Sequence, residues 1–404
     1  MKTLTYTRED GTVATWRDRK RLLWILALIP SSATFIAVGL VAATGWNAFW
    51  WAGPMIAFGL LPLLDVLAGE DGKNPPDEVI DALENDRFYR YTTYAYIPLQ
   101  YSSFFLACYI WSAWDLSVLS NIGLAITVGV TAGIGINTAH ELGHKKENLE
   151  RRLSRLVLAQ SAYGHFYIEH NRGHHVRVAT PEDPASSRIG ESFYRFWPRS
   201  VAGGVRSAWQ IESKRLQRVG SPVWGPKNDV LTAWLMTVAL FGASLAIFGL
   251  SIWPYLLIQA VFGFSLLEAV NYLEHYGLLR QRTPRGRYER CRPSHSWNSN
   301  HICTNVFLYH LQRHSDHHAN PTRRYQTLRT MDEAPQLPAG YSTMILLAVV
   351  PPLWYRLMDP KVARHYDGDM RLANIQPGKR ARVLAAYGIT DDAPAAEAYG
   401  ERAA

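Results

Sequence analysis

Nine of the fourteen histidines fall into four short clusters along the 404-residue chain. Two clusters, EHNRGHH at residues 169–175 and LQRHSDHH at residues 311–318, each place two adjacent histidines three to five residues after an earlier one. On a helix, residues three or four apart lie on one face, so each cluster can direct several imidazoles toward one point. Imidazole is a ligand for zinc, copper, iron and nickel. The nine candidate ligands are His140, His144, His170, His174, His175, His275, His314, His317 and His318.

The number of these histidines predicts two metal ions. One ion takes about four to six ligands, so nine exceed what a single ion can use. The alternative, a set of unrelated surface or core histidines, requires all four clusters to arise by coincidence. Because neutral imidazoles leave the charge of the ions uncompensated, nearby acids are expected to orient ring nitrogens and offset that charge. His310, four residues before His314, stays open as a tenth ligand.

Six apolar blocks are long enough to cross the hydrocarbon core of a bilayer, which takes about 20 residues. Buried helices of a large soluble protein are the alternative reading. We predict an all-α fold, a six-helix transmembrane bundle with a cytoplasmic helical cap that holds a histidine-rich dimetal site. The predicted spans cover residues 22–43, 46–67, 94–114, 122–139, 230–250 and 252–272.

Basic residues set the predicted orientation. Arg17, Arg19, Lys20 and Arg21 precede the first block, whereas the connections after the first, third and fifth blocks carry almost no Lys or Arg. The positive-inside rule therefore places the N-terminus in the cytoplasm, and six spans return the C-terminus to the same side. All four histidine clusters then lie on the cytoplasmic side.

The same count divides the chain into regions. Residues 1–276 form the predicted membrane domain, with a cytoplasmic insert at residues 140–229. Residues 277–390 form a C-terminal cytoplasmic region. Residues 391–404, rich in alanine and charge, are predicted to be a disordered tail.

Two acids inside the apolar blocks need partners, because a carboxylate within a membrane span is costly. Glu268 lies two helical turns before His275, and we predict that it hydrogen-bonds a ligand histidine. An interhelical bond of purely structural value is the alternative. Asp65, near the cytoplasmic end of the second block, is predicted to have a similar role.

The net charge of +8 suits a cytoplasmic face beside anionic lipid, and part of it is expected to serve an acidic protein partner. The sequence has no alternation of basic and aromatic residues of the kind that would indicate nucleic-acid binding. The three cysteines have neither CxxC spacing nor an even count, so they are interpreted as reduced.

Four motifs carry a resemblance to a known family. HELGHKK at 140–146, EHNRGHH at 169–175, NYLEHYGL at 271–278 and LQRHSDHH at 311–318 resemble those of the bacterial membrane-bound alkane 1-monooxygenases. These enzymes lie within the class of histidine-rich membrane fatty-acid desaturases and hydroxylases. The resemblance covers roughly residues 20–385, and NYLEHYGL is its most discriminating segment.

The resemblance implies two non-haem iron ions, O2 as oxidant, hydroxylation of a terminal methyl group of linear alkanes, electrons from rubredoxin and its reductase, and the bacterial inner membrane. A rubredoxin domain needs two CxxC pairs, which this sequence does not contain. The rubredoxin is therefore expected to be a separate chain or a domain outside this sequence.

The substrate path is predicted along the second block. Asp65, Phe58 and Trp51 are seven residues apart, so they fall close to one face of a regular helix, about 10 Å apart along it. A linear alkane could lie along Phe58 and Trp51 with its methyl group at the metal site. Ordinary helix packing is the alternative.

Two other functions remain open at this stage. A related desaturase or xylene-type methyl hydroxylase would keep the same metal site and differ in its product. A metal transporter would bind its cargo with the histidines, but transporters favour ligands near the middle of the bilayer. Eight of the nine histidines here lie outside the predicted spans.

Overall fold

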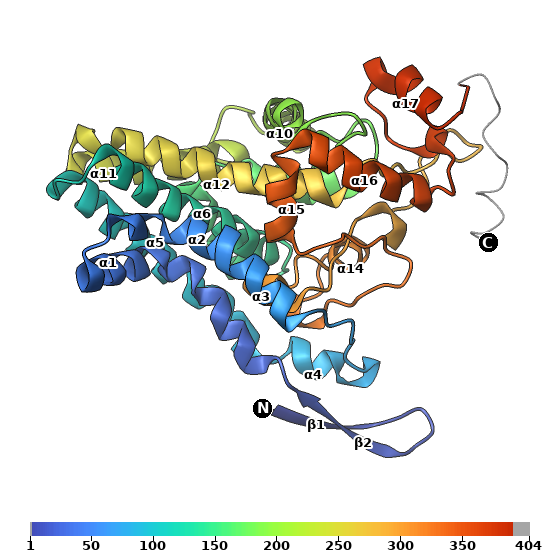
Figure 1. Cartoon of the computed structure of the whole chain (residues 1–404), viewed down its shortest axis with the longest axis horizontal. Coiled ribbons are helices and arrows are strands. Elements are labelled where there is room, and N and C mark those ends of the chain that lie inside the picture. The colour runs from blue at the N-terminus through green and yellow to red at the C-terminus, as the bar shows by residue number, and fades with distance from the viewer. Residues whose placement is uncertain (1, 391–404) are drawn as a thin grey trace.

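Five long apolar helical segments run side by side along the length of the molecule (Figure 1). The computed structural model describes residues 2–390. Within that range these five segments are long and apolar enough to cross a membrane, and each covers all or nearly all of one predicted span. The segments are Arg21–Thr44, Asn47–Ala68, Val118–Gly143, Asp229–Phe248 and Leu250–Glu274.

These segments contain α-helix, short 3-10 helices and one π-helical turn. The first is built from η1 (Arg21–Leu28), η2 (Pro30–Ser32) and α1 (Ala33–Thr44). The second is built from η3 (Asn47–Trp51), α2 (Ala52–Met55), the π-helical turn η4 (Ile56–Leu60) and α3 (Leu61–Ala68). The others are α6 (Val118–Gly143), α11 (Asp229–Phe248), and η7 (Leu250–Ile252) followed by α12 (Trp253–Glu274).

The remaining predicted span, residues 94–114, lies in the 27-residue helix α5 (Arg87–Ala113). This helix packs against α6 but is not one of the five apolar segments found within residues 2–390. The membrane bundle is therefore established with five candidate spans, and the count of six stays a prediction.

The outer surfaces of the bundle are apolar. On α11, the side chains of Leu235, Val238 and Ile247 are 63%, 65% and 70% exposed. A water-soluble protein rarely exposes such a continuous apolar face. Lipid is the solvent that suits it.

Close packing of α6 against α12 holds the centre of the bundle together. Gly133 of α6 and Gly263 of α12 face each other, and a Cβ atom added to Gly133 would lie 2.9 Å from the carbonyl oxygen of Gly263. Small residues at such contacts let two helix backbones approach closely. The contact fixes the relative position of the histidines that lie at the ends of these two helices.

Shorter helices cover one end of the bundle. The insert after α6 contains α7 (Asn148–Gln160), α8 (Phe166–Glu169), the π-helical turn η6 (His170–His174), α9 (His175–Arg177) and α10 (Phe193–Arg218). The region after α12 contains η8 (Pro293–His295), α13 (Ile302–Phe307), α14 (His314–Ala319), η9 (Tyr325–Thr327), α15 (Tyr341–Ala348), α16 (Pro351–His365), η10 (Met370–Leu372), η11 (Pro377–Lys379) and α17 (Arg380–Ala386).

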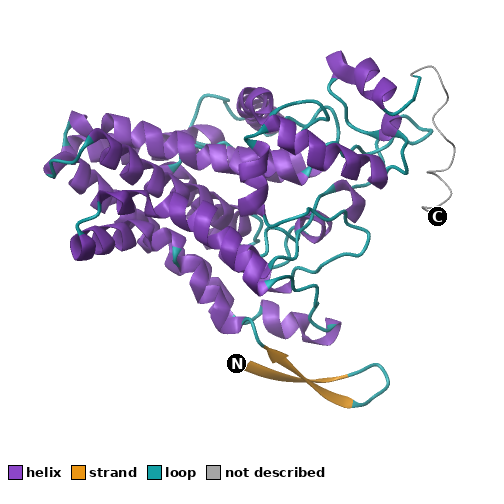
Figure 2. Cartoon of the chain, viewed as in Figure 1, coloured by secondary structure: helices purple, strands orange, loops and turns teal. Residues whose placement is uncertain are grey.

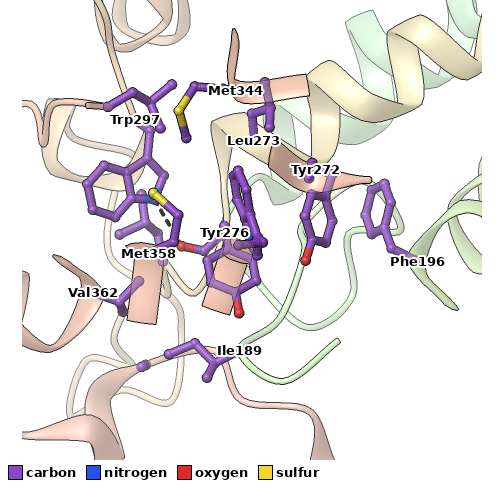
Figure 3. Packing of buried hydrophobic residues seen from close by; sticks show 14 of the residues in the cluster. Ile189, Phe196, Tyr272, Leu273, Tyr276, Trp297, Met344, Met358 and Val362 are labelled. Atoms are coloured by element: carbon purple, nitrogen blue, oxygen red, sulfur yellow. Dashed lines mark hydrogen bonds between the residues drawn. The ribbon is translucent and has the colours of Figure 1, made fainter. Parts of the chain in front are cut away.

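The C-terminal region shares its core with the membrane bundle. Tyr272 of α12 packs against Trp354 of α16 at a ring distance of 5.1 Å. Tyr276, Trp297 and Met358 lie in the same cluster, and the indole Nε1 of Trp297 donates to the carbonyl oxygen of Tyr276 (Figure 3). Because α12 ends within this core, its final turn and His275 are held firmly.

An N-terminal β-hairpin departs from the all-α prediction (Figure 2). Strands β1 (Lys2–Thr7) and β2 (Val13–Asp18) pair antiparallel, with Thr3 opposite Arg17. Half-buried and exposed side chains alternate along β1, which is the period of a strand with one face packed. Two short helices, η5 (Asp77–Val79) and α4 (Ile80–Glu84), precede α5. Asp86, in the linker between α4 and α5, forms ion pairs with Lys2 of the hairpin and with Arg21, and so anchors the hairpin. The predicted tail at 391–404 lies outside the described residues.

Candidate metal centre

The histidines of α6 lie at its buried C-terminal end. His140 and His144 are four residues apart, and their rings lie 4.9 Å from each other. His140 is in the last turn of the helix and His144 is its C-cap. The helix thus presents both imidazoles on one face, as their spacing predicts.

The EHNRGHH cluster does not form a regular α-helix. The backbone N–H of His175 bonds to the carbonyl oxygen of His170, five residues earlier, which is the bond of a π turn. Such turns often occur at functional sites because they change the direction of side chains within a helix. Here the Nε2 atoms of His170 and His175 come within 3.1 Å of each other, whereas His174 points elsewhere.

The remaining histidines come from the C-terminal half of the chain. His275 is the C-cap of α12, and His314, His317 and His318 all lie in the short helix α14. The Nε2 atoms of His314 and His275 lie 3.2 Å apart. Residues 177 positions apart also meet, since the Nε2 atoms of His140 and His317 are 2.9 Å apart.

All nine predicted ligands gather into two groups. Within each group the candidate ligand atoms lie within 4.8 Å of one another. Each pair of adjacent histidines sends one imidazole to each group, because neighbouring residues of a helix point about 100° apart. One group contains His140, His144, His170, His175 and His317, and the other contains His174, His275, His314 and His318.

The spacing of the nitrogens fits metal coordination. Imidazole nitrogens bind a first-row metal ion at about 2.0–2.1 Å, so two ligands at right angles lie about 3 Å apart. The Nε2 atoms of His318 and His314 are 2.8 Å apart, and those of His317 and His175 are 3.1 Å apart. In addition, Nε2 of His144 is buried with no hydrogen-bond partner among the described residues. Each group can therefore hold one ion.

Burial favours the neutral, metal-binding form of several of these histidines. Burial, and then the neighbouring histidines, hold the pKa of His317 and of His318 well below the usual range. The same two causes lower the pKa of His175 and His170. Imidazoles in this state have a free lone pair for coordination.

Asp183 orients His174 through the ring nitrogen Nδ1, which faces away from the histidine group. Nδ1 of His174 lies 2.9 Å from the carboxylate of Asp183, which also accepts hydrogen bonds from the Ser186 hydroxyl and the Ala185 backbone N–H. Burial alone would lower the pKa of His174, but the Asp183 carboxylate outweighs it and raises that pKa. This contact leaves Nε2 of His174 directed at its group. His275 is oriented similarly, since its Nδ1 lies 3.1 Å from the carbonyl oxygen of His295.

Glu274 reaches the group of four histidines. One oxygen of its carboxylate lies 3.2 Å from Nε2 of His314, and the other accepts a hydrogen bond from the Tyr341 hydroxyl. The side chain is 3% exposed. A carboxylate here can offset the positive charge of a bound ion.

The structure corrects the expected partner of Glu268. Its carboxylate accepts a hydrogen bond of 2.7 Å from the Tyr163 hydroxyl and not from a ligand histidine. The side chain does line a small cavity together with His170 and His174. Any support that it gives to the metal ligands is therefore indirect.

Asp65 has a partner that the sequence did not suggest. Both of its carboxylate oxygens accept hydrogen bonds from Thr304, one from the backbone N–H and one from the hydroxyl. It thereby caps the start of α13, and the expectation that it supports the metal ligands directly is wrong. His310 is also outside both groups, with Nδ1 bonded to the carbonyl oxygen of Tyr325 and Nε2 near Lys20.

An apolar pocket leads from the bundle to the histidines. Phe58 lines it, as do side chains of α6, α12 and α15, and His140, His170 and His314 lie at its inner end. The pocket therefore touches both histidine groups. Its wall is otherwise mostly apolar, and the other polar side chains on it are Asn137, Asn271, Glu274, Tyr341 and Ser342.

Trp51 lies outside this pocket. Its indole packs closely on Gly123, where an added Cβ atom would lie 2.5 Å from the ring nitrogen. The π turn η4 lies between Trp51 and Asp65 and contains Phe58, so the regular seven-residue spacing does not keep these side chains on one face. The structure brings Phe58 to the site and leaves Trp51 and Asp65 away from it.

Several basic residues near the site have structural partners. Lys145 pairs with Glu141, Arg323 with Asp316, and Arg324 with Glu150. By contrast, Lys146, Arg152, Arg285 and Arg287 are exposed. His144 and His175 are only half-buried, so the group of five histidines is the one nearer to solvent.

Long apolar helices that end in a buried set of histidines define a class of integral membrane proteins, and a family comparison names it. Residues 117–348 match the fatty acid desaturase family. That stretch includes α6, α12 and all nine histidines.

Comparison with curated proteins identifies a narrower family within this class. The chain is 48% identical over 93% of its length to the alkane 1-monooxygenase of Acinetobacter baylyi, and the match covers 92% of that protein. It is 45% identical to alkane 1-monooxygenase 1 of Alcanivorax borkumensis, with 95% of both chains covered. Similarity to the xylene/toluene monooxygenase hydroxylase component of Pseudomonas putida is lower, at 25% identity over 87% of this chain and 93% of that one. The chain belongs to the alkane 1-monooxygenase family.

Proposed function

We propose that this protein hydroxylates the terminal methyl group of linear alkanes to primary alcohols, with O2 as oxidant. The observation that carries this proposal is the apolar pocket that ends at both histidine groups. A pocket with few polar groups suits a hydrocarbon chain, whereas the histidines beside it supply groups that can bind a metal ion. Identity of 44–48% to several alkane 1-monooxygenases, against 25% to the xylene/toluene enzyme, favours an alkane over an aromatic substrate.

Two non-haem iron ions, one in each histidine group, are the proposed cofactors. Bound there, they would supply O2 activation, with two electrons and two protons converting the second oxygen atom to water. The protein residues have separate tasks. His174 is held by Asp183 and His275 by the carbonyl oxygen of His295, so these ligands need little reorganisation to bind. The apolar wall excludes water from the reacting methyl group.

The proposed location is the bacterial inner membrane, with both termini in the cytoplasm. The N-terminal hairpin, α14 and α17 lie toward the same end of the bundle (Figure 1). Both histidine groups also lie at that end, beyond the middle of the apolar helices. This position disfavours a metal transporter, whose ligands would lie near the midplane of the bilayer. Electrons are proposed to come from rubredoxin and its reductase.

Metal analysis and product identification on the same preparation test the function. We expect two iron ions per chain, and 1-octanol from octane supplied with O2, rubredoxin and its reductase. His275→Ala should lose metal and activity but still insert in the membrane, since the apolar helices end before it. The control is His365→Gln, a half-buried histidine outside both groups.

Three results would contradict the proposal. One ion per chain, or zinc in a preparation that still oxidises octane, would refute the two iron ions. An alkene product would favour a desaturase. Turnover of xylene but not of octane would favour the methyl hydroxylase of aromatic substrates.

Phe58 is proposed to limit the length of the substrate. Its ring lines the apolar pocket and comes from the π turn η4, which packs against α15. We expect Phe58→Ala to extend the range of accepted alkanes or Phe58→Trp to shorten it, measured by turnover across alkanes of increasing length. Phe49→Ala is the control, because Phe49 precedes the π turn and stacks on Trp46 instead. An unchanged length profile in both stable Phe58 variants would remove this residue from the substrate path.

A further inference from the structure

A second cavity, separate from the histidine groups, has more basic than acidic side chains in its wall. It lies where the start of α10 meets the loop before it and η11. Four of its side chains are basic and one is acidic. The four basic residues are Arg188, Arg195, Arg199 and Lys379, and the acid is Glu191.

The acid is already neutralised. Arg199 makes a two-pronged contact with Glu191, from Nε at 2.7 Å and from its terminal nitrogen at 2.8 Å. The guanidinium of Arg188 has no hydrogen-bond partner among the described residues, and burial together with Arg199 lowers its pKa. When the amide of Gln376 is turned to satisfy both ends, its oxygen accepts from Nε of Arg195 at 3.1 Å and its nitrogen donates to the carbonyl oxygen of Gly190 at 2.9 Å. The cavity therefore holds positive charge without a matching anion.

The surroundings place this cavity beside the bilayer. Tyr194, next to Arg195, is 62% exposed, and its hydroxyl donates to the carbonyl oxygen of Val349 between α15 and α16. That turn exposes Leu346, Val350 and Leu353, which are 41%, 41% and 50% accessible. A tyrosine and exposed aliphatic residues next to arginines are typical of the membrane interface.

We propose that this cavity binds the phosphate group of an anionic membrane lipid. Arg188 and Arg195 contact the phosphate, because guanidinium groups match phosphate oxygens in geometry and charge. The acyl chains of the lipid lie along Leu346, Val350 and Leu353. Lys379 adds charge but also donates to the carbonyl oxygen of Gly190, so it helps to hold the wall of the cavity.

Thermal unfolding of the purified full-length protein in detergent tests this site. Added phosphatidylglycerol should raise the midpoint in a saturable way, whereas phosphatidylcholine at the same concentration should not. In the double variant Arg188→Gln/Arg195→Gln we expect phosphatidylglycerol to bind roughly 30-fold more weakly, about fivefold for each charge lost. Arg206→Gln is the matched control, since Arg206 is an exposed arginine further along α10. This control should respond to the lipid as the unaltered protein does.

The other outcomes overturn the proposal. If Arg206→Gln loses as much lipid binding as the double variant, the attraction is diffuse and no site exists. If inorganic phosphate alone gives the same stabilisation, the ligand is a soluble phosphate and not a lipid. If phosphatidylglycerol and phosphatidylcholine act alike, the cavity has no preference for an anion. Lipid-free stability of the double variant, measured first, separates a binding defect from a folding defect.

Discussion

At the scale of single residues, the metal centre depends on one buried acid that the histidine motifs do not contain. Asp183 is fully buried and holds Nδ1 of His174 at 2.9 Å, while Ser186 and the Ala185 backbone N–H fix the carboxylate itself. A buried carboxylate needs such partners, and Asp183 has three. Its arrangement is therefore fixed before any metal binds.

Replacing Asp183 should weaken the group of four histidines. We expect Asp183→Asn to lower metal affinity by about 10- to 100-fold, because a neutral amide is a weaker acceptor than the carboxylate that orients the histidine. Titration of metal into the apo-protein measures this directly. Glu182→Gln is the control, since Glu182 is exposed and its nearest cation is 3.8 Å away. Unchanged affinity in Asp183→Asn would show that the negative charge of Asp183 is not needed to orient His174.

The nine histidines that gather into the two groups could be predicted from the sequence as candidate ligands, whereas their division into two groups could not. A regular helix would direct His170 and His174 to one point, but the π turn pairs His170 with His175 instead. Asp183 lies in an irregular loop nine residues after His174, where no helical periodicity marks it. Glu268 and Asp65 were recognised as buried acids that need partners, but their partners come from segments distant in the sequence.

At the scale of helices, the contact between α6 and α12 aligns the two halves of the site. Gly129 lies on this contact, where an added Cβ atom would come within 2.9 Å of Cβ of Phe262 and 3.1 Å of the carbonyl oxygen of Gln259. Neither atom can yield without moving the backbone of α12. His140 at the end of α6 and His275 at the end of α12 would then move apart.

A larger side chain at Gly129 should therefore damage both stability and metal binding. We expect Gly129→Val to destabilise the protein by about 1–3 kcal/mol, the usual effect of overpacking, and to reduce its iron content. Thermal unfolding in detergent and metal analysis provide the two measurements. Gly39→Val on α1 is the control, because nothing lies within 4 Å of a Cβ atom at that position. Equal losses in the two variants would mean that the valine itself, and not the contact, causes the damage.

Hydrophobic length predicted most of the helices, and five of the six predicted spans fall in apolar helices of sufficient length. Composition made α5 harder to assign, since tyrosines, threonines and serines interrupt its apolar residues. The β-hairpin was missed because its strands are short and polar and lie before the first apolar block. The π turn η4 was missed as well, and it explains why Trp51 and Asp65 do not accompany Phe58 into the pocket.

At the scale of the whole molecule, exposed positive charge lies close to the histidine group that is nearer to solvent. The chain carries a net charge of +8. Lys146 and Arg152 are exposed on the segment that follows His144, and His144 is one of the two half-buried ligands of its group. Lys145 and Arg324 are paired with acids inside the protein and cannot serve the same purpose. An acidic electron carrier would thus meet uncompensated positive charge close to the nearest ligands.

Electron delivery by rubredoxin should therefore weaken as salt increases. The Debye length falls from about 10 Å at 0.1 M to about 3 Å at 1 M, so long-range attraction is lost. We expect kcat/KM for separately added reduced rubredoxin to fall about tenfold or more over this range, with a smaller change in kcat. In the double variant Lys146→Glu/Arg152→Glu, kcat/KM for rubredoxin should already be low at about 0.1 M salt and should change less as salt increases. Arg8→Glu, in the exposed turn of the N-terminal hairpin, should behave as the unaltered protein does. A flat salt response in the unaltered protein would instead assign these charges to the lipid surface.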